Sequence, residues 1–162
     1  MWEWFQKKVL GRTDIWFGGS RYMRRWLFGP NWLWGLRVHC IERSDANREL
    51  HDHPFWFASL ILTGGYYEHT IDGERKWYGP GSIIFRSAET LHRVELAERT
   101  FDCAQDSWSE PVPAWTFVIR GRYARRWGFL KGGQWETWQK FVGERRGADS
   151  PETTPYRSRS SL

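Results

Sequence analysis

The sequence predicts an all-β fold, an antiparallel sandwich or barrel whose favoured form is a jelly-roll barrel with short peripheral helices. Short segments of alternating or apolar residues recur at near-regular spacing, glycine and proline turn signals separate them, and helical periodicity is scarce. His51 and His53 lie on a different predicted strand from His92, and a closed jelly-roll barrel brings such distant strands together around a ligand-sized interior. The length of 162 residues suits one domain.

The N-terminal part, residues 1–35, predicts one helix followed by strands. Residues 1–10 place their apolar side chains on one side of an amphipathic helix. Residues 14–35 alternate aromatic side chains with arginine and glycine, and glycine-bearing turns divide them into short strands.

The core of the predicted barrel spans residues 36–121. In the first of its strands Leu36, Val38 and Cys40 face one way, and the alternate side chains Arg37, His39 and Ile41 face the other. The turn signals include Asp72-Gly73, a dipeptide typical of two-residue hairpins. The remaining predicted strands cover 55–62, 66–71, 76–78, 82–85, 91–96 and 114–120, and the predicted polar loops cover 43–50 and 98–113.

The periodicity changes after Phe129. Trp135, Trp138 and Phe141 have helical spacing, which predicts a C-terminal helix over 134–142. From residue 144 onward almost nothing is apolar, so we expect a flexible tail. The expected organisation is therefore a single domain over 1–143, with its motif-bearing core at 36–121, and a tail over 144–162.

The composition excludes some classes of protein. Two cysteines cannot form a disulfide framework, and the sequence contains neither a signal-peptide pattern nor an apolar run of membrane-spanning length. We therefore expect a cytoplasmic protein without a membrane partner. The net charge of +5 suits an anionic small-molecule ligand, and nucleic acid is the least favoured partner.

The pattern His51-Asp52-His53-Pro54 is the clearest functional signal. Two histidines two residues apart on a strand share a face, and Pro54 favours extended backbone at His53. His92 returns from a later strand and can complete a metal site, since imidazole is the commonest protein ligand for mid-row divalent metals. Asp52 points to the opposite face and is a candidate for anchoring a loop.

These spacings resemble the two sequence motifs of the cupin superfamily, and the resemblance covers residues 36–121. In the first motif His51-x-His53 is followed by Gly64-Gly65, and in the second Gly81 precedes His92 by the family's offset. The resemblance maps the metal-ligand histidines of the family onto His51, His53 and His92. It also implies the jelly-roll barrel, or double-stranded β-helix, and a homodimer. The overall pattern is similar to an uncharacterised cupin group of bacteria and their phages.

The sequence also departs from those motifs. The position of the motif-one glutamate falls on Phe57 or Ala58, and its first glycine falls on Asp45. The expected site therefore has three histidine ligands, similar to the thiol dioxygenases of the superfamily. Alternatively, Glu68 reaches into the site and supplies a carboxylate.

The expected cofactor is one divalent transition metal, with Fe(II) favoured over Mn, Ni or Zn. Three imidazoles on Fe(II) leave positions open, which suits dioxygenase-like chemistry on a small polar or anionic molecule. The alternatives are a metal-dependent isomerase and a non-catalytic module that binds a sugar, a nucleotide or another small molecule. No general base is obvious, and the nearest catalytic candidates are Tyr66, Tyr67 and Glu68.

Arginines and aromatic rings are the candidates for substrate binding. Guanidinium groups suit carboxylate or phosphate, and rings can stack on a planar ligand. Alternatively, any single arginine forms an ion pair on the surface, and any single ring packs in the core. The candidates are Arg86, Arg93, Arg120, Trp56 and Trp115.

Overall fold

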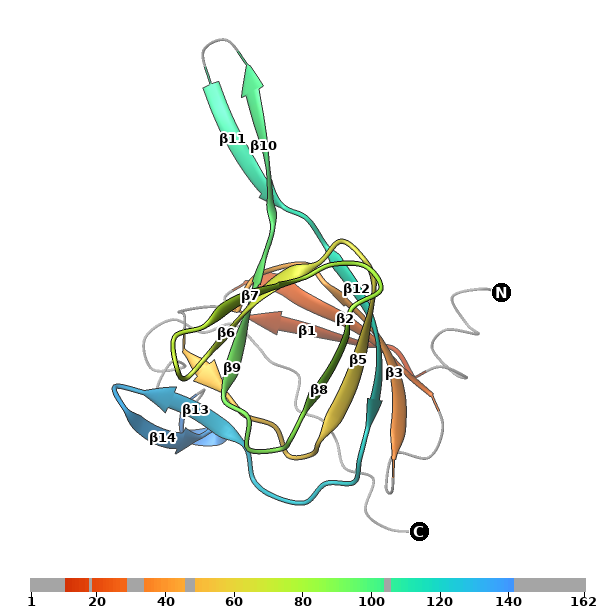
Figure 1. Cartoon of the computed structure of the whole chain (residues 1–162), viewed down its shortest axis with the longest axis vertical. Helices are drawn as coiled ribbons and strands as arrows, with labels where there is room; N and C mark the ends of the chain where they lie inside the picture. The colour runs from red at the N-terminus through yellow and green to blue at the C-terminus, as the bar shows by residue number, and fades with distance from the viewer. Residues whose placement is uncertain (1–10, 18, 29–33, 46–48, 104–105, 142–162) are drawn as a thin grey trace.

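Two antiparallel sheets of six strands each enclose a barrel, from which one hairpin projects (Figure 1). This computed structural model describes residues 11–17, 19–28, 34–45, 49–103 and 106–141. The predicted all-β barrel is confirmed. The predicted helix over 1–10 and the predicted tail over 144–162 lie outside the described residues.

We name each sheet after a central strand. In order across the sheet, the β12 sheet contains β1 (Thr13–Phe17), β2 (Ser20–Phe28), β3 (Gly35–Ile41), β12 (Ala114–Arg120), β5 (Phe57–Thr63) and β8 (Ile83–Arg86). The β9 sheet contains β14 (Gln134–Thr137), β13 (Gly128–Lys131), β4 (Leu50–His51), β9 (His92–Leu96), β6 (Tyr66–Thr70) and β7 (Arg75–Tyr78).

The interior of the barrel is divided into an apolar part and a polar part. The apolar cluster lies towards the end of β9 that leads into the projecting hairpin, and its members come from both sheets. Towards the other end, β9 begins with His92 and β12 ends with Arg120, and both side chains are buried. The apolar cluster consists of Met23, Ile41, Ile61, Tyr66, Ile84, Val94, Leu96 and Ala114.

The projecting hairpin corrects the predicted loop over 98–113. Strands β10 (Glu98–Cys103) and β11 (Asp106–Pro111) pair antiparallel over their whole length and stand away from the barrel (Figure 1). Phe101 and Trp108 stack on each other with ring centroids 4.3 Å apart. A hairpin that packs on no sheet buries no continuous apolar face, so the apolar alternation that marks a strand was weak here.

The predicted helix over 134–142 is partly wrong. Gln134–Thr137 form β14 instead, which pairs with β13 across a turn at Gly132 and Gly133. Helical backbone covers 138–141. Trp135 lies on the strand and Trp138 beyond it, so pairing with β13 overrides the helical spacing of the rings.

In the described part of the chain, no helix has the length and apolar character that crossing a membrane requires.

The turn between β5 and β6 depends on Gly64. Its backbone has φ of +72°, and a Cβ placed there would lie 2.3 Å from the carbonyl oxygen of Pro113. Gly73, in the turn between β6 and β7, has a similar φ of +83° with no atom within 4 Å of such a Cβ. The two turns therefore share the backbone requirement and differ in the space for a side chain.

We predict that Gly64→Ala destabilises the protein more than Gly73→Ala. The left-handed backbone accounts for a loss of about 1 kcal/mol at either position. At Gly64 the clash with Pro113 raises the loss in the free energy of unfolding to about 3 kcal/mol. Urea denaturation of both variants measures the difference, and equal losses would contradict it.

Candidate metal centre

The histidine pair sits where β4 ends. His51 is the last residue of β4 and pairs directly with His92 of β9. His53 follows the strand rather than extending it, and its backbone N–H donates to the carbonyl oxygen of Ala88 at 3.2 Å. The strand thus positions His51, whereas the segment before β9 holds His53, a correction to the prediction of one strand carrying both.

The three imidazoles converge inside the barrel. Ligand atoms of His51, His53 and His92 all lie within 4.8 Å of one another, and the Nε2 atoms of His53 and His92 are 2.8 Å apart. The ring centroids are 5.0 to 5.1 Å apart in every pair. Together they face one common point.

The outer nitrogens of two of these rings face carboxylates. His92 Nδ1 lies 2.7 Å from Glu68 Oε1, and Arg86 donates to the same carboxylate through Nε at 3.0 Å. His51 Nδ1 lies 3.6 Å from an oxygen of Asp45. A carboxylate that accepts from an imidazole N–H fixes the tautomer and the orientation of the ring, and of these two carboxylates only Glu68 lies within hydrogen-bond distance. This bond leaves Nε2 of His92 to face Nε2 of His53.

Asp45 is itself held in place, although the sequence analysis gave it no role. Its carboxylate accepts from the Tyr22 hydroxyl at 2.5 Å and from the Val94 backbone N–H at 2.6 Å. Because Val94 lies on β9, these bonds tie the segment that carries Asp45 to the strand of His92. The residue that replaces a motif glycine thereby holds its carboxylate 3.6 Å from Nδ1 of His51.

Burial keeps the imidazoles of His51 and His53 neutral, and hydrogen bonds keep the carboxylate of Glu68 charged. Burial lowers the pKa of His51 and lowers that of His53 well below its ordinary range. Burial alone would raise the pKa of Glu68, but the hydrogen bonds from His92 and Arg86 outweigh it and hold that pKa at about 2. Near neutral pH His51 and His53 therefore offer lone pairs, which a metal ligand requires.

The donor set fits a single divalent metal. Two nitrogens that bind one metal at right angles, each about 2.1 Å from it, lie about 3 Å apart, close to the separation between His53 and His92. Phe57 occupies one of the two positions on which the motif glutamate falls. Its ring lies 4.9 Å from that of His53 and 5.8 Å from that of His92. An apolar wall thus stands in place of a fourth ligand.

The catalytic candidates from the sequence do not provide an unengaged base. Glu68 lies behind His92 and pairs with Arg86, so it supports the triad instead of joining it. Tyr66 belongs to the apolar cluster, and burial raises its pKa well above the ordinary value. The exposed side of β6 carries Tyr67, which packs against Trp77 with ring centroids 4.9 Å apart.

The substrate-binding candidates are divided between the inside and the outside of the barrel. Arg86 is committed to Glu68 and the Tyr78 hydroxyl. Arg120 is fully buried, donates to the Gly121 carbonyl oxygen and lies over the ring of Phe55. The ring of Phe55 also lies 6.2 Å from the ring of His53. Arg120 therefore lies on the same side of the interior as His53.

The other three candidates lie outside the barrel. Arg93 is next to His92 in sequence, so strand alternation turns it outward, where it contacts His69 at 3.1 Å. Trp115 faces outward for the same reason and stacks on Trp26 at 5.3 Å, since its neighbour Thr116 faces the interior. Trp56 is 44% exposed. The sequence analysis chose these three side chains for their size or charge, but it did not show that they lie on the outer face of the barrel.

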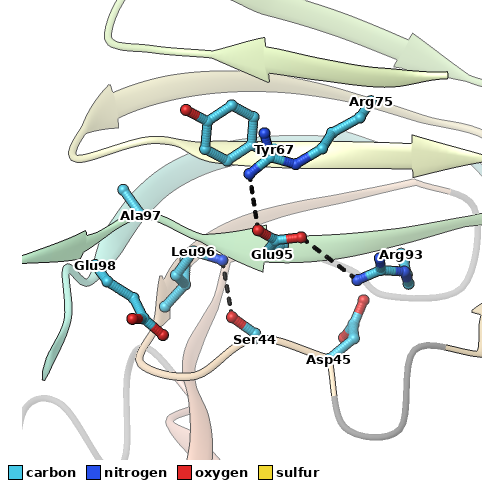
Figure 2. Close-up of a pocket in the computed structure, with 9 residues that line it drawn as sticks. All are labelled: Ser44, Asp45, Tyr67, Arg75, Arg93, Glu95, Leu96, Ala97 and Glu98. Atoms are coloured by element: carbon cyan, nitrogen blue, oxygen red, sulfur yellow. Dashed lines mark hydrogen bonds and ion pairs between the residues drawn. The ribbon is translucent and has the colours of Figure 1, made fainter. Parts of the chain in front are cut away.

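A surface pocket of about 630 Å³ lies over this outer side of β6 and β9 (Figure 2). Arg75 and Arg93 both pair there with Glu95, at 2.8 and 3.7 Å. Asp45 borders the pocket and also faces His51, so it links this surface to the triad. The histidines themselves do not line the pocket, and its arginines already have acidic partners.

Asp52 anchors the segment after β12, in line with its candidate role as a loop anchor. It accepts from Arg125 at 2.5 Å, from the Gly128 backbone N–H at 2.7 Å and from Trp135 Nε1 at 2.9 Å. These three donors follow β12 in the chain, and Gly128 begins β13. Asp52 therefore fixes β13 and β14 beside the histidine pair.

The sequence analysis also missed a basic group on β2 and β3. Arg25, Arg37 and His39 lie on the interior side of these strands. The alternation over 36–41 placed Arg37 and His39 on one face, which was the available signal. It did not reveal that this face points into the barrel.

Comparison with known proteins identifies the fold. No family model and no curated protein matches the sequence. A cupin-2 domain protein from Rhodospirillum rubrum matches in structure with a TM-score of 0.52 and 11% identity, over 85% of this chain and 82% of that one. HutD from Pseudomonas fluorescens matches with a TM-score of 0.51 and 11% identity, over 70% and 56% of the two chains.

A structure of Fe(II)-HppE with the alternative substrate (S)-1-HPP also matches, with a TM-score of 0.50 and 8% identity, over 72% of this chain and 57% of that one. Identities this low establish the fold and leave the activity to be argued from the site. The chain has the jelly-roll fold of the cupin superfamily, with His51, His53 and His92 clustered inside its barrel.

Proposed function

We propose that this cupin is a mononuclear metalloenzyme in which three histidines hold one divalent transition metal. The observation that carries the proposal is the convergence of His51, His53 and His92, with Glu68 behind one ring and Asp45 behind another. Carboxylates placed in this way give metal-ligating histidines both orientation and basicity.

The favoured chemistry is the oxygenation of a small polar or anionic molecule with Fe(II) as the metal. When bound, Fe(II) supplies redox chemistry with O2, and Mn, Ni or Zn supplies polarisation of a carbonyl group. The chain contributes the imidazoles of the triad, of which His51 and His53 are neutral near pH 7, and the apolar ring of Phe57 beside His53 and His92. Because three protein ligands leave positions open, the same site can receive a substrate beside the metal.

A second candidate is a cupin that binds a small molecule without converting it. One observation favours it. Of the catalytic candidates, Glu68 is a carboxylate engaged by His92 and Arg86, and Tyr66 is a phenol within the apolar cluster. Under this alternative the metal and the barrel interior position a ligand, and no turnover follows.

We predict that the purified protein contains about one equivalent of a divalent transition metal. His51→Ala, His53→Ala and His92→Ala should each lower that content about tenfold or more, because each removes one of three ligands. His69→Ala is the matched control, since His69 pairs with Glu95 on the outer side of β6. Mass spectrometry of the metal content provides the measurement, and full metal in all three triad variants would refute the site.

We predict that Glu68→Gln weakens both the fold and the metal site. Losing the carboxylate leaves Arg86 without its buried partner, which lowers the free energy of unfolding of the metal-free protein by about 3 kcal/mol. Metal affinity should fall about 10- to 100-fold, because His92 loses its orienting acceptor. Glu95→Gln, at a pair on the surface, should change stability by less than about 1 kcal/mol. Urea denaturation and metal titration measure the two effects, and equal behaviour of the two variants would contradict the role of Glu68.

We further predict that the Fe(II)-loaded protein keeps open coordination positions. Nitric oxide is a probe for such positions, and its addition to the anaerobic protein should produce the EPR signal of iron with bound nitric oxide. The His69→Ala variant should give the same signal. An unchanged spectrum in protein that contains its full iron would favour the binding module.

A further inference from the structure

A group of basic side chains lies inside the barrel beside the triad. Arg25 on β2 pairs in register with His39 on β3, and Arg37 lies two residues before His39 on the same face. Arg25 shares its face with Met23 of the apolar cluster and contacts Met23 Sδ at 4.0 Å. Arg37 is 4% exposed. Alternation therefore directs all three basic side chains to the interior side, where Arg37 is buried and Arg25 and His39 are half-buried.

No carboxylate compensates this group among the described residues. None of the ion pairs formed by those residues includes Arg25 or Arg37, although Arg24, next to Arg25, pairs with Glu42 at 2.7 Å. The Nε atoms of Arg25 and Arg37 and the Nε2 atom of His39 are buried and lack a hydrogen-bond partner in the described structure. Burying an uncompensated guanidinium is strongly unfavourable, and an unsatisfied buried group points to a missing water or ion.

The mutual effect of these charges agrees with that placement. Burial, and then the neighbouring Arg37, lower the pKa of Arg25 to about 10. Burial and the two arginines likewise lower the pKa of His39 well below its ordinary value. Near neutral pH Arg25 therefore remains charged while His39 is neutral.

Phe55 connects this group to the histidine triad. Its ring lies 5.1 Å from the guanidinium carbon of Arg37 and 6.2 Å from the ring of His53. Arg120 approaches the same ring to 4.9 Å. A molecule held by the arginines would therefore lie on the His53 side of the triad, within the same part of the interior.

We propose that Arg25, Arg37 and His39 form a binding site for a small dianion whose carboxylate or phosphate oxygens are held by the two guanidinium groups. Guanidinium forks match the oxygens of both anions in geometry and charge. This anion site deepens the proposed function. It rests on that function in one respect, because the anion would be the substrate or ligand presented to the metal centre. The binding itself requires the arginines and not the metal.

Calorimetric titration of the metal-free full-length protein tests the site without any contribution from the metal. Malonate and inorganic phosphate are the probes, and malonamide is the uncharged control for malonate. We expect a dianion to bind with a Kd of about 1 mM or lower, and malonamide not to bind. Tighter binding of malonate would assign a dicarboxylate ligand, and tighter binding of phosphate would assign a phosphoryl group.

Variants separate this site from general attraction to a basic protein. Arg25→Gln and Arg37→Gln should each weaken dianion binding about tenfold or more. Arg75→Gln, which removes an equal charge on the outer side of β7, should leave binding unchanged. Arg37→Lys retains the charge without the fork and should bind with intermediate affinity, which keeps a folded variant available if a glutamine variant does not fold.

The outcomes distinguish this inference from the proposed function. His53→Ala should lose metal and still bind the dianion, whereas the glutamine variants should keep metal and lose the dianion. If the wild-type protein bound the dianion but no metal, the metal centre would be refuted and the anion site would be supported. Absence of dianion binding by the wild type, or equal binding by Arg25→Gln, Arg37→Gln and Arg75→Gln, would overturn the anion site.

Discussion

The hydrogen-bonded series His92, Glu68 and Arg86 is the interaction on which the histidine centre depends. Glu68 lies on β6 and His92 on β9, in one sheet, while Arg86 reaches Glu68 from β8 in the other sheet. A buried carboxylate is tolerated because both its neighbours donate to it, and the low dielectric of the interior strengthens those bonds. The same three side chains therefore join the two sheets and orient one imidazole of the triad.

The two parts of the barrel interior have opposite effects on the stability of the fold. Apolar side chains from both sheets fill the part nearest the hairpin and provide the burial that favours folding. The part around His53 instead contains Arg25 and Arg37, whose burial without carboxylates opposes folding. Proteins tolerate such unfavourable groups at binding sites, and the apolar part offsets the loss here.

The proposed site restricts the possible functions of this protein more than its fold does. Cupin barrels host many activities, so the fold restricts function very little. In the proposed metal centre, the triad with Phe57 at a motif position for a carboxylate limits the protein ligands to three histidines, and the basic side chains on β2 and β3 favour an anionic second ligand. The proposal therefore favours a small anion over a neutral sugar as the ligand.

The sequence by itself determined most strand positions and the spacing of the three histidines, because alternation and turn residues are local properties of the chain. It did not reveal the hairpin of β10 and β11 or strand β14, because each depends on pairing with a neighbouring strand. Alternation also defines two faces of a strand without saying which one is enclosed. That choice belongs to the packing of the two sheets, which turned Arg93 and Trp115 outward and enclosed Arg37 and His39 with the triad.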